Sequence, residues 1–171
     1  MAIVTDKILD KVLKNIESLE EEALNELVQS YFEKQPFVMA YVMVFTEGMS
    51  NEEAANELVY GALVVLECFY SISNAIPQIT EEEIESAENK QIELLQKFEK
   101  MTDPTEQMEI AMSMMSSQMI LLAFITELFV DNGVEDDSFF TEEDSGAAFG
   151  TVKLIADLLS KKTDSPGLRK V

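Results

Sequence analysis

Two stretches of the chain share one pattern, and together they decide the fold. "ELVQSYFEKQPFVMAY" runs from Glu26 to Tyr41, and "EIAMSMMSSQMILLAF" runs from Glu109 to Phe124. Most aligned positions exchange one apolar residue for another. Either the chain contains an internal duplication, or the stretches look alike because helices with buried faces share one periodicity. Four aligned pairs are identical: Glu26 and Glu109, Ser30 and Ser113, Gln35 and Gln118, and Ala40 and Ala123.

The order of the flanking signals favours duplication. Each stretch is followed by a glycine, Gly48 or Gly133, then by an acidic linker, and then by a helix with a Ser or Thr cap. We therefore predict two related halves at 1–77 and 78–162, followed by a loosely ordered tail at 163–171. Two copies are fewer than a stacked solenoid needs, so a compact bundle is the better prediction.

Helix start signals recur along the chain, whereas strand signals are almost absent. Four segments resemble capping boxes, in which a hydroxyl residue is followed three residues later by an acid: 18–21, 50–53, 80–83 and 141–144. The expected fold is a single all-α domain over 1–171, a bundle of about six or seven helices. The expected helices are 6–16, 18–34, 36–47, 51–75, 81–101, 104–132 and 142–161.

Two segments look buried on every side. Pro36 to Phe45 has no polar face, and Leu58 to Leu66 has almost none. Such helices belong at the centre of a bundle or in a subunit interface. We therefore expect these two to pack together, and we expect the chain to be able to form a homodimer.

Cys68, the single cysteine, should be a small buried hydrophobe. Without a secretory signal or an evident membrane span, the expected location is cytoplasmic.

The chain is strongly acidic. Thirty-three acids against twelve bases give a formal charge of −21, and two long stretches, 35–89 and 101–152, contain no Lys or Arg. This field repels nucleic-acid phosphates and anionic lipid headgroups, so we expect neither nucleic acid nor membrane as a partner. It favours a basic protein or a cation, while solubility alone is an equally open explanation.

The composition argues against catalysis. Histidine is absent, which removes the usual general base and the commonest metal ligand, and the only arginine is Arg169 in the tail. No Gly-rich phosphate loop is present. We therefore expect no enzyme, no cofactor and no metal. A helical enzyme that uses carboxylates alone ranks third, behind a protein-binding module and a ligand-binding bundle. Glu67, the lone charge in an apolar run, should face solvent or accept a hydrogen bond.

The acidic segment from Asp131 to Asp144 is the best metal candidate. Read as a calcium loop, it offers Asp131, Glu135, Asp137 and Glu142 at ligand positions, but Gly133 and Asp136 stand where a ligand and the turn glycine belong. A solvated acidic linker is the simpler interpretation. Its acids remain candidate contacts for a basic partner: Asp131, Glu135, Asp136, Asp137, Glu142 and Glu143.

The methionines give the second candidate site. Met108, Met112, Met115 and Met119 fall at steps of four, three and four residues, so one continuous helix would carry them on a single face. Such side chains fill irregular cores, or they bind amphipathic helices of a partner. The predicted function is a non-enzymatic adaptor or regulatory module for protein partners. The alternative is a bundle that binds a small ligand or a divalent cation.

Overall fold

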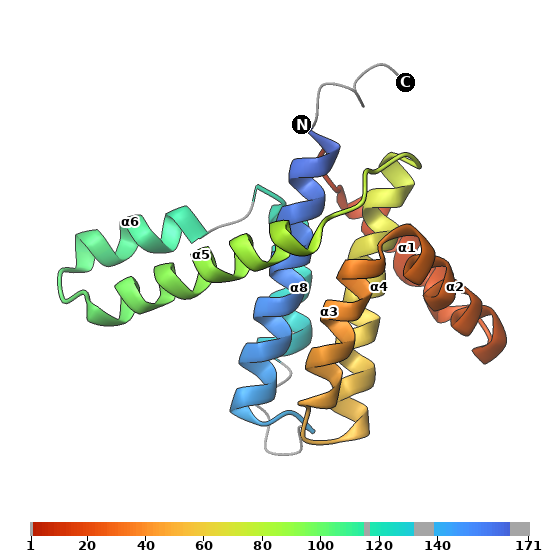
Figure 1. Ribbon diagram of the computed structural model, residues 1–171, viewed down its shortest axis with the longest axis horizontal. Helices are drawn as coiled ribbons and strands as arrows, with labels where there is room; N and C mark the ends of the chain where they lie inside the picture. Colours follow the sequence, from red (N-terminus) through yellow and green to blue (C-terminus); the bar gives the residue numbers. More distant parts are fainter. Residues whose placement is uncertain (1, 115–116, 132–138, 165–171) are drawn as a thin grey trace.

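The protein is entirely helical over the residues that its structure describes. The computed structural model describes residues 2–114, 117–131 and 139–164, with the backbone alone for 111–114. These residues form eight α-helices and one π-helix and contain no strand, so the all-α prediction is confirmed. In chain order (Figure 1) the elements are α1 (Asp6–Glu17), α2 (Glu21–Lys34), α3 (Pro36–Glu47), α4 (Glu52–Ile72), α5 (Glu81–Lys100), α6 (Pro104–Met114), α7 (Met119–Thr126), η1 (Glu127–Asp131) and α8 (Glu142–Thr163).

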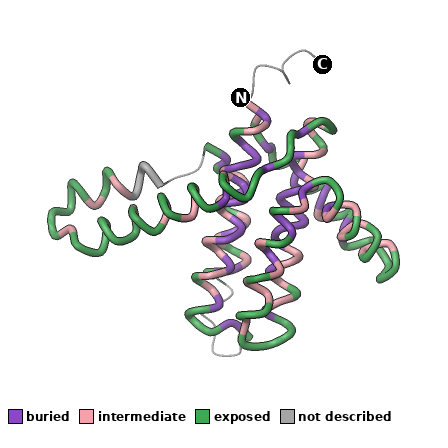
Figure 2. The backbone as a smooth tube through the Cα atoms, in the orientation of Figure 1, coloured by how far each residue is buried: buried purple, intermediate pink, exposed green. Residues whose placement is uncertain are grey.

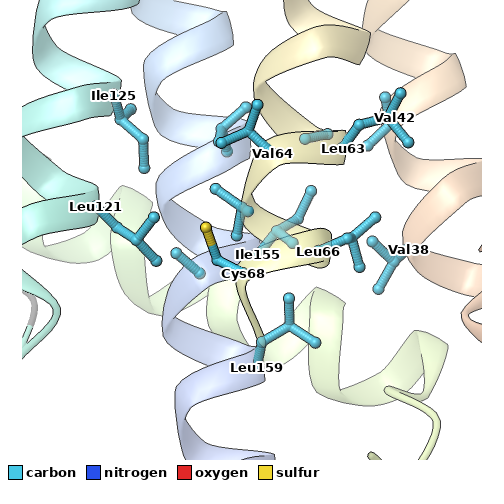
Figure 3. Close-up of a cluster of buried hydrophobic side chains, with 14 of the residues drawn as sticks. Val38, Val42, Leu63, Val64, Leu66, Cys68, Leu121, Ile125, Ile155 and Leu159 are labelled. Atoms are coloured by element: carbon cyan, nitrogen blue, oxygen red, sulfur yellow. The ribbon is translucent and has the colours of Figure 1, made fainter. Parts of the chain in front are cut away.

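The core lies around α4 and α8. These two helices pack against each other, α3 packs against α4, and α7 with η1 packs against α8. In Figure 3, Val64 from α4 and Ile155 from α8 lie between Val42 of α3 and Ile125 of α7. The prediction that 36–45 packs against 58–66 is confirmed, because every residue from 61 to 66 is buried against this core.

One described helix, α4, is long and apolar enough to cross a membrane by length and composition. Half of its apolar window is buried inside the protein. The central helix of a water-soluble bundle meets the same criteria, because it is apolar on all sides. We therefore interpret α4 as a core helix.

Two of the four predicted helix caps are confirmed. Thr80 and Thr141 form capping boxes that start α5 and α8. The other two are wrong by one or more residues. The Ser18 hydroxyl donates to the Asn15 carbonyl, and α2 starts later, at Glu21. The cap of α4 is Asn51, whose side-chain oxygen accepts from the Ala54 amide at 2.8 Å and so replaces a serine hydroxyl.

The predicted single helix over 104–132 is wrong. The chain leaves helical geometry before α7, where Gln118 has φ −93° and ψ 70°, and it widens into the π-helix η1 at 127–131. We attribute the break before α7 to the fully buried Gln118 side chain. Its Oε1 accepts from the Val4 amide at 2.9 Å, and its Nε2 donates to the Ala2 carbonyl at 2.8 Å and to the Ser160 hydroxyl at 3.1 Å. Local apolar periodicity carries no information about these distant contacts.

Gln35 makes the same kind of contact between α2 and α3. It is fully buried and non-helical, with φ −136° and ψ 67°. Its Oε1 accepts from the Ile79 amide at 2.9 Å, and its Nε2 donates to the Pro77 carbonyl at 3.1 Å and to the Tyr70 hydroxyl at 3.0 Å. Each glutamine therefore binds the backbone just before another helix, α1 for Gln118 and α5 for Gln35. We call these contacts the glutamine joints.

Two helix pairs project from the core on opposite sides (Figure 1). The α1–α2 pair lies on one side, where α1 contacts α4 and α2 contacts α3. The α5–α6 pair lies on the other and extends further from α8. Ile84 is the buried residue of α5, close to its start. Of the predicted tail at 163–171, Thr163 ends α8 and is buried, and 165–171 lie outside the described residues.

Candidate functional site

The predicted methionine stripe does not form one helical face. Met108 lies on α6 and Met119 on α7, and the break before α7 separates the two helices. Both side chains are exposed, at 66% and 52%, so neither fills the core. The side chains of Met112 and Met115 lie outside the described residues. Met108 and Met119 therefore belong to two separate surfaces.

The acidic candidates are only partly described. Asp131 is exposed at the end of η1, and Glu142 and Glu143 are exposed in the first turn of α8. There they suit the helix dipole, which favours negative charge at an N-terminus. Among the described residues, no group of three or more acids or cysteines is placed to hold a metal ion. The remaining candidates lie outside the described residues: Glu135, Asp136 and Asp137.

The outer side of α3 is an uncovered apolar surface. We call Phe37, Ala40 and Val44 the α3 face; all three are exposed, Phe37 at 42% and Val44 at 65%. Glu47, an exposed acid, is the last residue of α3, and the exposed Glu33 and Lys34 precede α3 at the end of α2. The expectation that this helix is buried on every side is wrong for this face. Val38, Met39 and Val42 are fully buried on the opposite side, against the core.

The α3 face is held on a rigid support. The Tyr41 hydroxyl donates to Glu88 of α5 at 2.6 Å, and the Tyr41 ring meets Phe45 edge-on at 5.0 Å. Burial, followed by the bond to Glu88, raises the pKa of Tyr41 above its usual value, so the hydroxyl stays protonated and keeps donating. The position of α3 is therefore fixed from two directions, by α4 and by α5.

A second surface of the same kind lies on α7 and η1. Met119, Ala123 and Val130, the α7 face, are exposed, and Glu127 and Asp131 are exposed beside them. Ala123 aligns with Ala40 in the two similar stretches, and both alanines face solvent. The described residues thus include an apolar face on α3 and one on α7 and η1, each with acids next to it. Contiguous exposed apolar residues with a polar border occur at interaction sites, whereas single exposed apolar residues are ordinary surface.

The polar cluster around Tyr31 is the nearest approach to a catalytic arrangement. Tyr31 is fully buried and donates a short hydrogen bond to Glu67. Its ring meets Tyr70 edge-on at 5.4 Å, and the Lys34 ammonium lies 5.1 Å and 5.2 Å from the two ring centres. Burial, followed by the bond to Glu67, raises the pKa of Tyr31 well above its usual range. A hydroxyl that is buried and protonated in this way holds helices together and is a poor acid or base.

Cys68 and Glu67 behave as the sequence predicts. Cys68 is fully buried, and burial together with the neighbouring Glu67 raises the pKa of its thiol to about 12. Because the thiolate is the reactive form, this cysteine is inert at neutral pH. Glu67 is half-buried and accepts the bond from Tyr31, which confirms the expected hydrogen-bonded role.

The sequence does not distinguish the α3 face from the buried side of the same helix. Phe37, Ala40 and Val44 are spaced by three and four residues, as on one side of a helix. Every neighbouring position is apolar too, so the buried and exposed sides of the helix show no contrast in polarity.

No protein family, curated protein or solved structure matches the chain. A proposal for its function therefore has to be argued from the surfaces of this chain alone.

Proposed function

We propose that the protein is a non-enzymatic adaptor that binds a protein partner through the α3 face. The observation that carries the proposal is the exposure of Phe37 and Val44 on a helix that is otherwise packed into the core. The face lies within 35–89, a stretch without a single basic residue. An apolar centre with an acidic border suits a partner whose apolar residues are flanked by Lys or Arg, such as a basic amphipathic helix.

The two parts of this surface have different tasks. The apolar side chains supply affinity, because burying apolar area is favourable and central aromatic residues dominate binding energy. The acids guide a basic partner to the surface and discriminate against acidic ones. Salt therefore slows association, whereas truncating Phe37 or Val44 speeds dissociation.

Capture from the native host tests the adaptor function. The tagged chain is washed at low salt and again at about 0.3 M salt, where exposed charges are largely screened. The double variant Phe37→Ser/Val44→Ser should lose a stoichiometric partner that the wild type retains. The matched control is Ile3→Ser/Leu19→Ser, which removes two exposed apolar side chains elsewhere and should retain the partner. Equal capture by both variants would overturn the α3 face as the site.

The second candidate function is the binding of a divalent cation or a small ligand. Its support is an open hollow along α2 that is lined by acidic and amide side chains: Glu20, Glu21, Glu22, Asn25, Glu26, Gln29, Ser30 and Glu33. The carboxylates of this hollow attract cations, although no three of them are placed to hold one metal ion directly. Calorimetry with Ca²⁺ and Mg²⁺ tests this function, because saturable uptake below millimolar concentration would favour it over the adaptor.

We also propose that the two halves arose by internal duplication, with α1–α4 matching α5–α8. The glutamine joints are the main support. Gln35 and Gln118 occupy the same position in the similar stretches, and each binds one backbone amide, one backbone carbonyl and one hydroxyl. The bound segments match as well, since each is followed at once by a threonine cap, Thr80 or Thr5.

The contacts of the joints are reciprocal, as expected for a pseudo-twofold arrangement. Gln35 of the first half binds the segment that opens the second half, and Gln118 of the second half binds the segment that opens the first. A twofold interface has this property, because each unit presents the same surface to the other. Coexpression of the separate fragments 1–75 and 76–171 tests the proposal. Duplicated halves should assemble into a soluble one-to-one complex.

A further inference from the structure

The α5–α6 pair carries large apolar side chains that are exposed in the described part of the chain. We call residues 90–110 the α5–α6 arm. Figure 2 shows it as exposed or half-buried along its length, and none of its side chains is buried. Large apolar residues are exposed on both of its helices: Ile92 at 46%, Leu95 at 44%, Phe98 at 38% and Met108 at 66%.

The two helices of the arm contact each other, but no side chain from 90 to 110 is buried between them. Isolated helices shorter than about 12–15 residues are marginal in water, and α6 has 11 residues. Helices in proteins owe most of their stability to an apolar side packed against a second layer. At the base of the arm, Ile84 is buried and Gln91 donates to the Gly150 carbonyl, but from Ile92 onward this support ends. The described part of the chain therefore supplies no second layer for the arm.

The charges of the arm indicate what that layer is. Lys90, Lys97 and Lys100 are the only basic residues between 35 and 152, and with Glu93 and Glu99 they leave 90–100 with a net charge of +1. The facing helix α6 carries acids and no base, Glu106 and Glu109. A foreign basic partner would meet the three lysines. A second arm, by contrast, brings acidic α6 against the 90–100 segment of α5, which has a net charge of +1, in both directions.

We propose that the protein forms a homodimer in which two α5–α6 arms pack into a four-helix bundle, with α5 of each copy lying on α6 of the other. Two helical hairpins suffice for such a bundle, and a twofold axis makes both contacts equivalent. The contact buries Leu95, Phe98 and Met108 of both copies. It also brings two chains of charge −21 together at the segment of α5 that is not acidic. The α3 face stays available for the partner of the adaptor.

Sedimentation velocity and light scattering on the full chain over micromolar concentrations test the proposal. The wild type should have twice the chain mass of 19.2 kDa, and Leu95→Glu/Phe98→Glu should return to one chain mass. The control is Asn89→Glu/Gln96→Glu, which adds the same charge at exposed polar positions of α5 and should remain dimeric. Leu95→Ser/Phe98→Ser serves as a second variant that adds no charge, with circular dichroism to verify folding.

Three outcomes would overturn the arm-to-arm dimer. The wild type could remain monomeric at every concentration, or a dimer could survive both substitutions at Leu95 and Phe98. A dimer abolished by Phe37→Ser/Val44→Ser but not by the arm variants would place the contact on the α3 face. The arm variants leave the α3 face intact, so they should still capture the partner of the adaptor. Loss of the dimer therefore tests the arm, and loss of the partner tests the α3 face.

Discussion

Replacing either buried glutamine by methionine should destabilise the protein by several kcal/mol. Gln35→Met and Gln118→Met keep the length and nearly the volume of the side chain but remove its amide. Each change leaves one buried backbone amide and one carbonyl without their partner, Ile79 and Pro77 in one joint, Val4 and Ala2 in the other.

The magnitude follows from the desolvation of these groups. An unsatisfied buried polar group costs about 1–3 kcal/mol; the amide of each joint is buried and the carbonyl is part-buried and costs less, so the two together cost about 2–5 kcal/mol. The hydroxyls of Tyr70 and Ser160 lose a bond as well, but a hydroxyl can rotate toward another acceptor. For a chain of this length, such a change lowers the melting temperature by roughly 4–20 °C. It is a large fraction of the ~5–15 kcal/mol by which a typical domain is stable.

Urea unfolding followed by circular dichroism measures the effect directly. The control is Gln29→Met on the exposed side of α2, which should stay within about 0.5 kcal/mol of the wild type. If Gln35→Met is as stable as this control, the buried hydrogen bonds do not hold the helices as described. Duplicated halves further require similar losses for Gln35→Met and Gln118→Met. A large loss for one and none for the other would contradict the matching of the joints.

Three smaller predictions concern single sites. Gly61→Ala should cost about 1–3 kcal/mol, because the added Cβ would lie 2.6 Å from the buried Phe129 ring; Gly146→Ala has open space and should add up to about 1 kcal/mol. Burial acts to raise the pKa of Asp144, but hydrogen bonds from Thr141 and Ser50 outweigh it and lower the pKa. Its contribution to stability is thus present above pH ~4 and is lost in more acid solution, so in acid titrations Asp144→Ala should differ from the wild type only above that range. Cys68 should resist alkylation at pH 8 in the folded protein and react once urea unfolds it, and rapid labelling without urea would refute its burial.

The parts of the fold that depend on local chemistry could be predicted from the sequence. Threonine followed by an acid located the starts of α5 and α8, because a capping box is a property of four consecutive residues. The continuous apolar run in α4 located the centre of the core. From the sequence, Pro36 either starts a new helix or kinks a long one; the structure places it at the first position of α3, where proline is well tolerated.

The break before α7 could not be predicted, because its cause is far away in the sequence. Gln118 leaves the helix to bind Ala2 and Val4, more than 110 residues earlier. The prediction of one methionine face was wrong for the same reason, because a face shared by Met108 and Met119 requires one unbroken helix. The α3 face was missed for a different reason. In an all-apolar segment the sequence does not state which side a neighbour covers, and only the placement of α4 and α5 leaves Phe37 and Val44 exposed.

Photo-cross-linking in the native host tests the adaptor function most directly. Benzoylphenylalanine is placed at Val44 in the α3 face, and in a control at Gln29, which is exposed on α2. An adaptor that binds through the α3 face should give one dominant adduct at position 44, joining the chain to a different protein with a basic surface, and no matching adduct at position 29. No adduct at position 44, the same adducts at both positions, or an adduct with a second copy of this chain would contradict the proposed function.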